Sequence, residues 1–263
     1  MNGTYVYCLV AAPRRPSMTR VPRGVPGLGR PRLIDVPATK NGAARSTWLV
    51  AADAPLDRFG EEAINRGLSD LDWVSRAAVA HEAVIEAFVA APAVLPMKLF
   101  TIFTSDERAR DHVRGDGSRI AALVKRVANH QEWGVRVMLD RAPAATSAPA
   151  ATRAKKTSPS GRSFLMQKKA QRDLVTERAE RAQESVAGLY DALAARAREA
   201  KRRAASELPV KGGPLLLDAA FLVPAAKAAS FRSLVGRQAR ALERSGYRVS
   251  LTGPWPPYTF VQD

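Results

Sequence analysis

The segment TYVYCLVA, residues 4–11, is the first of several apolar runs that decide the fold class. β-Branched and aromatic residues fill it and Pro13 follows it, so it is predicted to form a buried strand. Similar runs occur further along the chain, at residues 32–36, 47–52, 94–103 and 133–139. An apolar stripe at helical spacing begins near Ser75 and ends before Pro92. Interleaved strands and helices predict an N-terminal α+β domain, a ferredoxin-like sandwich, over residues 1–140.

The second half of the chain begins with a change of composition. Residues 141–162 are rich in Ala, Pro, Ser, Thr, Arg and Lys and contain no acidic residue, which predicts a flexible basic linker. Residues 163–207 then carry a long helical signal, which predicts one long helix or two helices in series. Its heptad spacing predicts a coiled-coil-like seam, either between helices of one chain or in a dimer, at Val175, Ala179, Ala182, Val186, Leu189 and Leu193. A strand, a helix and a last strand follow, so residues 163–263 are predicted to form a C-terminal α+β domain.

The charge balance of the 263 residues is strongly basic. There are 41 Lys and Arg against 25 Asp and Glu, a net charge of +16, which favours an anionic partner such as nucleic acid, an acidic protein face or an anionic membrane. The single cysteine, Cys8, cannot form an internal disulfide, and no apolar stretch approaches the ~20 residues of a membrane span. Arg14 and Arg15 follow the first apolar run, the wrong order for a secretory signal. These features predict a cytoplasmic protein.

Patterns typical of catalysis are weak. His81-Glu82 begins like the HExxH helix of zinc proteases, but Ile85 occupies the place of the second histidine, so one metal ligand is missing. The phosphate-binding patterns GxxxxGK[ST] and GxGxxG do not occur. We therefore expect no metal, no cofactor and no enzymatic activity, with His81 partly covered by the core and Cys8 an inert buried thiol.

The basic excess leaves a second class of function open, a basic nucleic-acid-associated protein. Such proteins usually interleave aromatic with basic residues or carry a recognition helix. Aromatic residues make up only 6% of this chain, and they fall in the predicted cores and the tail rather than in the exposed, arginine-rich loop at 13–32. A solvated basic surface or an acidic protein partner fits this distribution better.

The C-terminal segment GPWPPYTF, residues 253–260, contains three prolines and three aromatic residues. Because proline fixes φ and lacks a backbone donor, the segment is predicted to be a rigid polyproline II stretch that joins no central strand or helix. It could be a ligand for an aromatic groove, or a clamp across the second domain or between the domains. Its continuity with the last strand favours the clamp. If Trp255 is fully buried, Trp255→Ala should cost about 3 kcal/mol.

Four elements, taken in order, resemble one family. They are Tyr5-Val6-Tyr7, His81-Glu82 followed by Val94-Leu95-Pro96-Met97, Glu132-Trp133, and Gly253-Pro254-Trp255-Pro256-Pro257-Tyr258. Together they resemble the GvpL/GvpF family of gas vesicle proteins over nearly the whole chain. The resemblance implies an accessory, structural protein of gas vesicle assembly that binds the small hydrophobic shell protein and assists nucleation or growth of the vesicle wall. Other gas vesicle accessory proteins are further implied partners, and the implied location is the gas vesicle in the cytoplasm.

The same resemblance marks the motif residues as structural positions of the family. These are Tyr7, His81, Glu82, Leu95, Pro96, Met97, Trp133, Gly253, Pro254, Trp255, Pro256, Pro257 and Tyr258. It also implies an N-terminal ferredoxin-like domain and a C-terminal α+β domain with a helical, coiled-coil-like part. Two positions depart from the family pattern, since Phe100 and Cys8 stand where glycine is common.

Overall fold

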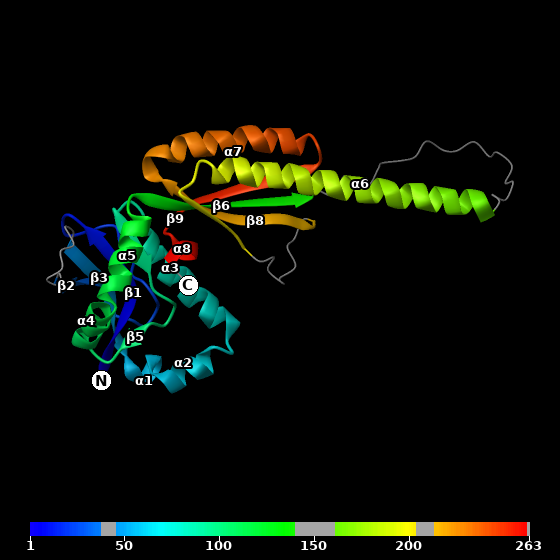
Figure 1. Cartoon of the computed structure of the whole chain (residues 1–263). Coiled ribbons are helices and arrows are strands. Elements are labelled where there is room, and N and C mark those ends of the chain that lie inside the picture. Colours follow the sequence, from blue (N-terminus) through cyan, green and yellow to red (C-terminus); the bar gives the residue numbers. More distant parts are fainter. Residues whose placement is uncertain (38–45, 140–160, 204–212, 262–263) are drawn as a thin grey trace. The chain divides into compact units, whose positions relative to one another are not determined.

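The structure, a computed structural model, describes residues 1–37, 46–139, 161–203 and 213–261. It is a mixed α/β protein with two sheets (Figure 1). Residue contacts divide the chain into two compact units, and each unit is assembled from separate segments. The first unit comprises Met1–Trp133, Leu222–Ala226 and Gly253–Asp263, and the second comprises Gly134–Phe221 and Lys227–Thr252. Residues 141–160 of the predicted linker lie outside the described residues, and the three-part division of the chain stays a prediction.

The sheet of the first unit has the strand order β2-β3-β1-β4, with the short strand β5 also paired to β1. The strands are β1 (Asn2–Ala12), β2 (Arg32–Val36), β3 (Ser46–Pro55), β4 (Ala93–Pro96) and β5 (Ile102–Phe103). All their pairings are antiparallel. Because β1 lies inside this sheet and is covered on both faces, its residues from Gly3 onward are buried, which explains the continuous apolar run.

Helices cover the two faces of this sheet (Figure 1). They are α1 (Leu56–Phe59), α2 (Glu61–Gly67), α3 (Leu71–Glu86), α4 (Asp106–Gly115) and α5 (Gly117–Val127). One core cluster joins β1 to α3, and the other joins β1 to α4 and α5. A register shift between Val6 and Cys8 places Tyr7 and Cys8 in the same cluster although they are adjacent in sequence. The ferredoxin-like arrangement stays a prediction.

Side-chain caps fix where two of these helices begin. The Asp70 carboxylate accepts from the Trp73 N–H, so α3 begins at Leu71, earlier than the stripe from Ser75 predicted. The Ser105 hydroxyl accepts from the Arg108 N–H at the start of α4. Within the described residues, no helix is long and apolar enough to cross a membrane.

The sheet of the second unit has the order β7-β8-β6-β9. Its strands are β6 (His130–Leu139), β7 (Glu199–Arg202), β8 (Leu215–Pro224) and β9 (Tyr247–Trp255). Helices α6 (Gly161–Ala194) and α7 (Ala228–Glu243) pack together along one side of it (Figure 1), and a 3₁₀ turn, Ala225–Lys227, precedes α7. Phe221 of β8 lies with its ring centroid 5.7 Å from that of Tyr190 in α6 and 5.6 Å from that of Phe231 in α7. These aromatic contacts join the helices to the sheet.

The long helical signal is confirmed for α6, but its predicted end at residue 207 is wrong. The helix ends at Ala194, and residues 199–202 form strand β7 at the edge of the sheet. There the guanidinium of Arg202 lies 4.4 Å from the centroid of the Tyr190 ring. In residues 199–202, pairing of β7 with β8 overrides the local preference for helix. Of the predicted seam, Ala182, Val186, Leu189 and Leu193 are buried; the side chains of Val175 and Ala179 lie outside the described set, and the coiled-coil character stays a prediction.

Candidate functional site

A buried cluster of hydrogen-bonded rings brings together motif residues from three parts of the sequence. His81 on α3 has Nε2 3.1 Å from the Met97 carbonyl oxygen and Nδ1 2.7 Å from the Tyr5 hydroxyl. Because a carbonyl only accepts, Nε2 carries the proton and Nδ1 accepts from Tyr5. The Tyr5 oxygen in turn accepts from the Phe100 N–H at 3.4 Å. Both nitrogens of the imidazole are therefore engaged in its neutral form.

The environment of this histidine favours a structural role. Burial lowers the pKa of His81, against a smaller opposing effect of its bond to Met97. Burial also raises the pKa of Tyr5 and of Tyr7. The expectation that His81 is only partly covered is wrong, because its side chain is buried beneath both tyrosines. Among the described residues, no group of three His, Cys, Asp or Glu side chains could hold a metal ion.

Tyr7 connects this cluster to the arginine-rich loop at 13–31. Its ring stacks on the His81 ring with centroids 5.4 Å apart, and the Tyr5 and Tyr7 centroids are 4.8 Å apart. The Tyr7 hydroxyl accepts a hydrogen bond of 3.1 Å from the Val25 N–H. One end of Tyr7 thus packs in the core while the other holds the loop.

Leu95, Pro96 and Met97 lie where β4 leaves the sheet. Leu95 pairs with Leu9, and Pro96 pairs with Cys8 at the end of the strand. The Met97 N–H then donates to the Tyr7 carbonyl at 2.9 Å. Pro96 is tolerated there because β4 ends the strand order, at the edge of the sheet, and the strand stops before β5.

The turn after Met97 places Phe100 in a backbone conformation that favours glycine. Phe100 has φ 63°, in the left-handed region that favours glycine. Phe100 lies within a turn of residues 98–101. The Thr101 N–H and hydroxyl close this turn, since both donate to the Lys98 carbonyl, at 3.1 and 2.7 Å. The Phe100 ring stacks on Trp73 with centroids 4.9 Å apart and an interplanar angle of 8°. This contact offsets the backbone cost of a side chain at that φ.

These two opposing effects can be separated by mutation. Phe100→Ala loses the stack and keeps the backbone strain, whereas Phe100→Gly loses the stack and relieves the strain. We expect the glycine variant to be the more stable of the two by about 1 kcal/mol in denaturant unfolding, the reverse of the usual order of the two residues. An alanine variant as stable as the glycine variant, or more stable, would show that this φ carries no cost.

Three other residues selected from the sequence lie around the same core. Cys8 is fully buried, and burial raises its thiol pKa, as expected of an unreactive thiol. Glu82 is exposed on α3. Tyr258 packs against the core from the tail, and burial, together with the carboxylates of Glu82 and Glu86, raises its pKa.

The tail begins as the end of a strand, so the prediction of a polyproline II stretch is wrong for this part. Gly253, Pro254 and Trp255 are the last residues of β9, which lies at the sheet edge. Edge strands tolerate proline because a missing N–H on the open side breaks no pairing. Gly253 has φ 121°, and a Cβ there would lie 2.9 Å from the Glu132 carbonyl oxygen and 3.2 Å from the Trp133 ring. Only glycine fits this turn without displacement.

The rest of the tail forms a short helix, α8 (Tyr258–Val261), in place of the expected extended segment. Pro256 and Pro257 are buried just before it, and Phe260 is fully buried. Trp255, the expected anchor, is only partly buried. The helix contacts β4 and belongs to the first unit. Residues of the tail therefore close onto the first unit, whereas the sequence favoured a clamp at the second domain or between domains.

A buried carboxylate, to which the sequence assigned no role beyond the Glu132-Trp133 element, holds this helix. Glu132 accepts from the Thr259 N–H at 2.7 Å and from the Thr259 hydroxyl at 2.6 Å. Its side chain is almost completely buried, so these charge-assisted bonds offset the cost of removing the carboxylate from water. The two residues are 127 positions apart, and no local pattern relates them.

Known proteins that are similar to this chain cover nearly its whole length. The family model described as gas vesicle synthesis protein GvpL/GvpF matches residues 3–262. Gas vesicle protein L of Streptomyces sp. (strain CB03234) is 31% identical over 261 residues, which span 98% of this chain and 92% of that protein.

Two crystal structures are similar to this one. GvpF from Anabaena sp. PCC7120 matches with a TM-score of 0.63 at 17% identity, covering 100% of this chain and 97% of that one. GvpF from Microcystis aeruginosa matches with a TM-score of 0.59 at 15% identity, covering 99% of each chain. At these identities the likeness establishes a shared fold.

Proposed function

The chain belongs to the GvpL/GvpF family of gas vesicle synthesis proteins, and we propose that it is an accessory, structural protein of gas vesicle assembly. In this role it binds the small hydrophobic shell protein and assists nucleation or growth of the vesicle wall. The family match over residues 3–262 carries the proposal. The motif residues support it, because they build a rigid first unit from distant segments rather than a catalytic constellation.

The first unit also offers an apolar surface suited to a hydrophobic partner. Leu68, Leu71 and Val79 are large apolar side chains with 49%, 79% and 65% of their surfaces exposed. Leu68 follows α2, and the other two lie on the solvent side of α3. Apolar side chains on the outer face of a helix can anchor a protein partner. The Asp70 cap and the buried His81 hold α3 in place, so this surface is preorganised, and we place shell-protein binding here.

A pull-down of the shell protein after co-expression tests this function. The double substitution Leu71→Ser with Val79→Ser should reduce capture about tenfold, because two partly buried apolar contacts are worth roughly 1.4 kcal/mol. The unfolding temperature should stay unchanged, since neither side chain lies in the core. The control is Leu139→Ser with Met166→Ser, which removes apolar side chains that are 40% and 65% exposed in the second unit.

The possible results separate the function from its location. Equal capture by wild type and the α3 double variant would mean that the shell protein binds elsewhere. No capture by wild type, together with normal vesicle formation after deletion of the gene, would exclude the assembly role.

The remaining details of the role are proposals of the same kind. We place the protein in the cytoplasm, at the gas vesicle, with other gas vesicle accessory proteins as further partners. The apolar seam of α6, of which Ala182, Val186, Leu189 and Leu193 are buried, supports a coiled-coil-like helix pair within the chain.

A further inference from the structure

The loop between β1 and β2, residues 13–31, carries an unusual concentration of positive charge. It has no acidic residue, and it forms neither a helix nor a strand. Five of its side chains are exposed guanidinium groups, those of Arg14, Arg15, Arg20, Arg23 and Arg30.

The loop is nevertheless held firmly against the first unit. Val25 is 2% exposed in the core, and its N–H donates to the Tyr7 hydroxyl. Further along, the Gly29 N–H donates to the Asp53 carbonyl at 2.8 Å. Gly24 and Gly27 have φ of 80° and 93°, and a Cβ at Gly24 would overlap the Tyr7 hydroxyl. The arginines are therefore presented from a defined backbone, which reduces the entropy lost on binding.

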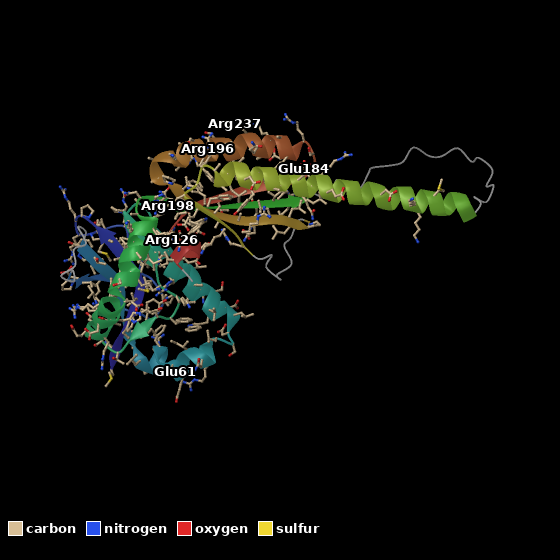
Figure 2. All side chains as sticks on the ribbon, viewed as in Figure 1. Glu61, Arg126, Glu184, Arg196, Arg198 and Arg237 are labelled. Carbon is tan, nitrogen blue, oxygen red and sulfur yellow. The ribbon has the colours of Figure 1, made fainter. Side chains whose placement is uncertain are left out.

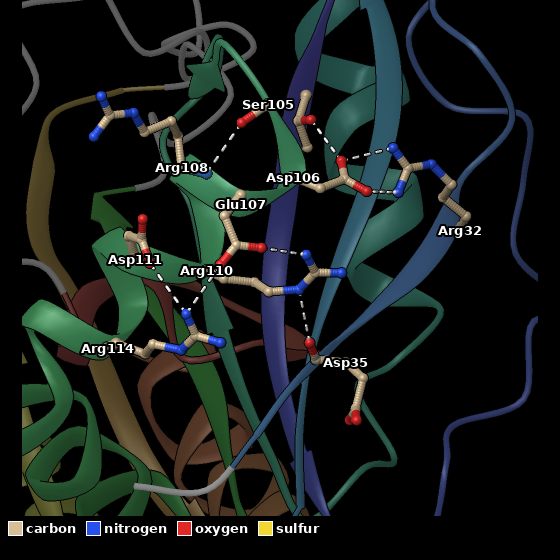
Figure 3. A network of polar contacts seen from close by, with 10 residues as sticks. Arg32, Asp35, Ser105, Asp106, Glu107, Arg108, Arg110, Asp111 and Arg114 are labelled. Atoms are coloured by element: carbon tan, nitrogen blue, oxygen red, sulfur yellow. Dashed lines mark hydrogen bonds and ion pairs between the residues drawn. The ribbon is translucent and has the colours of Figure 1, made fainter.

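None of the five arginines has an ion pair or hydrogen bond with another described residue. The next arginine along the chain shows the contrast. Arg32 donates to both carboxylate oxygens of Asp106 at 2.8 Å (Figure 3), and to Asp53 at 2.7 Å. These bonds also lower the pKa of Asp106. Arg32 thus binds the Asp106 carboxylate in a fork, whereas no described carboxylate is within reach of the loop arginines.

The chemistry of the loop favours one kind of partner. No aromatic residue lies in 13–31 to stack on bases, and no helix or strand is present to enter a groove of duplex DNA. Its larger apolar side chains, Met18, Val21 and Leu28, pack against the core with Val25 and so cannot anchor a membrane. Guanidinium forks match carboxylates in geometry and charge. We propose that the loop is a docking surface for a carboxylate-rich protein segment, a second surface that does not depend on shell-protein binding.

The test compares two variants of the full chain that lose the same charge. In the first, all five loop arginines are replaced by glutamine. In the control, five exposed arginines of the second unit are replaced by glutamine, two of them labelled in Figure 2: Arg196, Arg232, Arg237, Arg240 and Arg244. The probe is fluorescent poly-L-glutamate at about 0.1 M salt, where charges farther apart than about 10 Å are largely screened.

We expect the loop variant to bind the probe about tenfold more weakly than wild type, and the control to change by less than about threefold. Equal losses in both variants would overturn the proposal in favour of diffuse net charge. So would a larger loss for duplex DNA or for phosphatidylserine vesicles than for poly-L-glutamate. Capture of the shell protein should stay at the wild-type level in the loop variant, so failure of this proposal is distinguishable from failure of the assembly role.

Discussion

Replacing Phe260 with alanine should lower the free energy of unfolding by about 4 kcal/mol, because the ring is fully buried and its loss leaves a cavity. Phe260 lies in α8, and Tyr258 and Val261 of the same helix pack on the two core clusters of the first unit. Denaturant unfolding followed by circular dichroism measures the effect, since the variant keeps most of the helix content that gives the signal.

The matched substitution is Trp255→Ala. This change would cost about 3 kcal/mol if Trp255 were fully buried, but the side chain is only partly buried. We therefore expect less than half the loss seen for Phe260→Ala. Equal losses for the two variants would contradict the assignment of Phe260 as the principal anchor of the tail.

Glu132→Ala should cost about 3 kcal/mol, because it removes a buried acceptor of two charge-assisted hydrogen bonds from the partly buried donors of Thr259. Glu132→Gln keeps one acceptor oxygen and should cost less, about 1–2 kcal/mol. An exposed glutamate such as Glu184 (Figure 2), changed to alanine, should alter stability by less than about 0.5 kcal/mol.

A double-mutant cycle shows whether Glu132 acts through the tail. Thr259→Val removes only the hydroxyl and should cost about 1 kcal/mol. Because Glu132→Ala and Thr259→Val both remove the bond between the Thr259 hydroxyl and Glu132, the two effects should overlap by at least about 0.5 kcal/mol in the combined variant. Strictly additive losses would mean that Glu132 stabilises the fold through other groups.

Much of the local architecture could be predicted because its causes are local. The strands expected at 32–36 and 133–139 are observed as β2 and within β6. β-Branched and aromatic runs favour strands whatever the rest of the chain does. The motif residues His81 and Met97 were selected through the family resemblance, but nothing in their spacing indicated a shared hydrogen bond.

The errors have a common origin in contacts between distant residues. Residues 199–202 carry a helical pattern and yet form β7, because pairing with β8 stabilises a strand there. The tail was expected to stay extended on account of its prolines, and it forms α8 where Glu132 binds Thr259. Phe100 adopts a positive φ that favours glycine, and its ring stacks on Trp73, 27 residues earlier, which offsets the backbone cost.

The residues alone thus predict most of the strands and helices, the basic charge and the family of this protein, because each of these depends on residue type and short spacing. Three features follow from contacts between distant residues: the tail packs on the first unit, Tyr5 bonds to His81, and Tyr7 holds the loop at 13–31. A buried polar group must find its partner wherever the fold places one, and that partner can lie more than a hundred residues away.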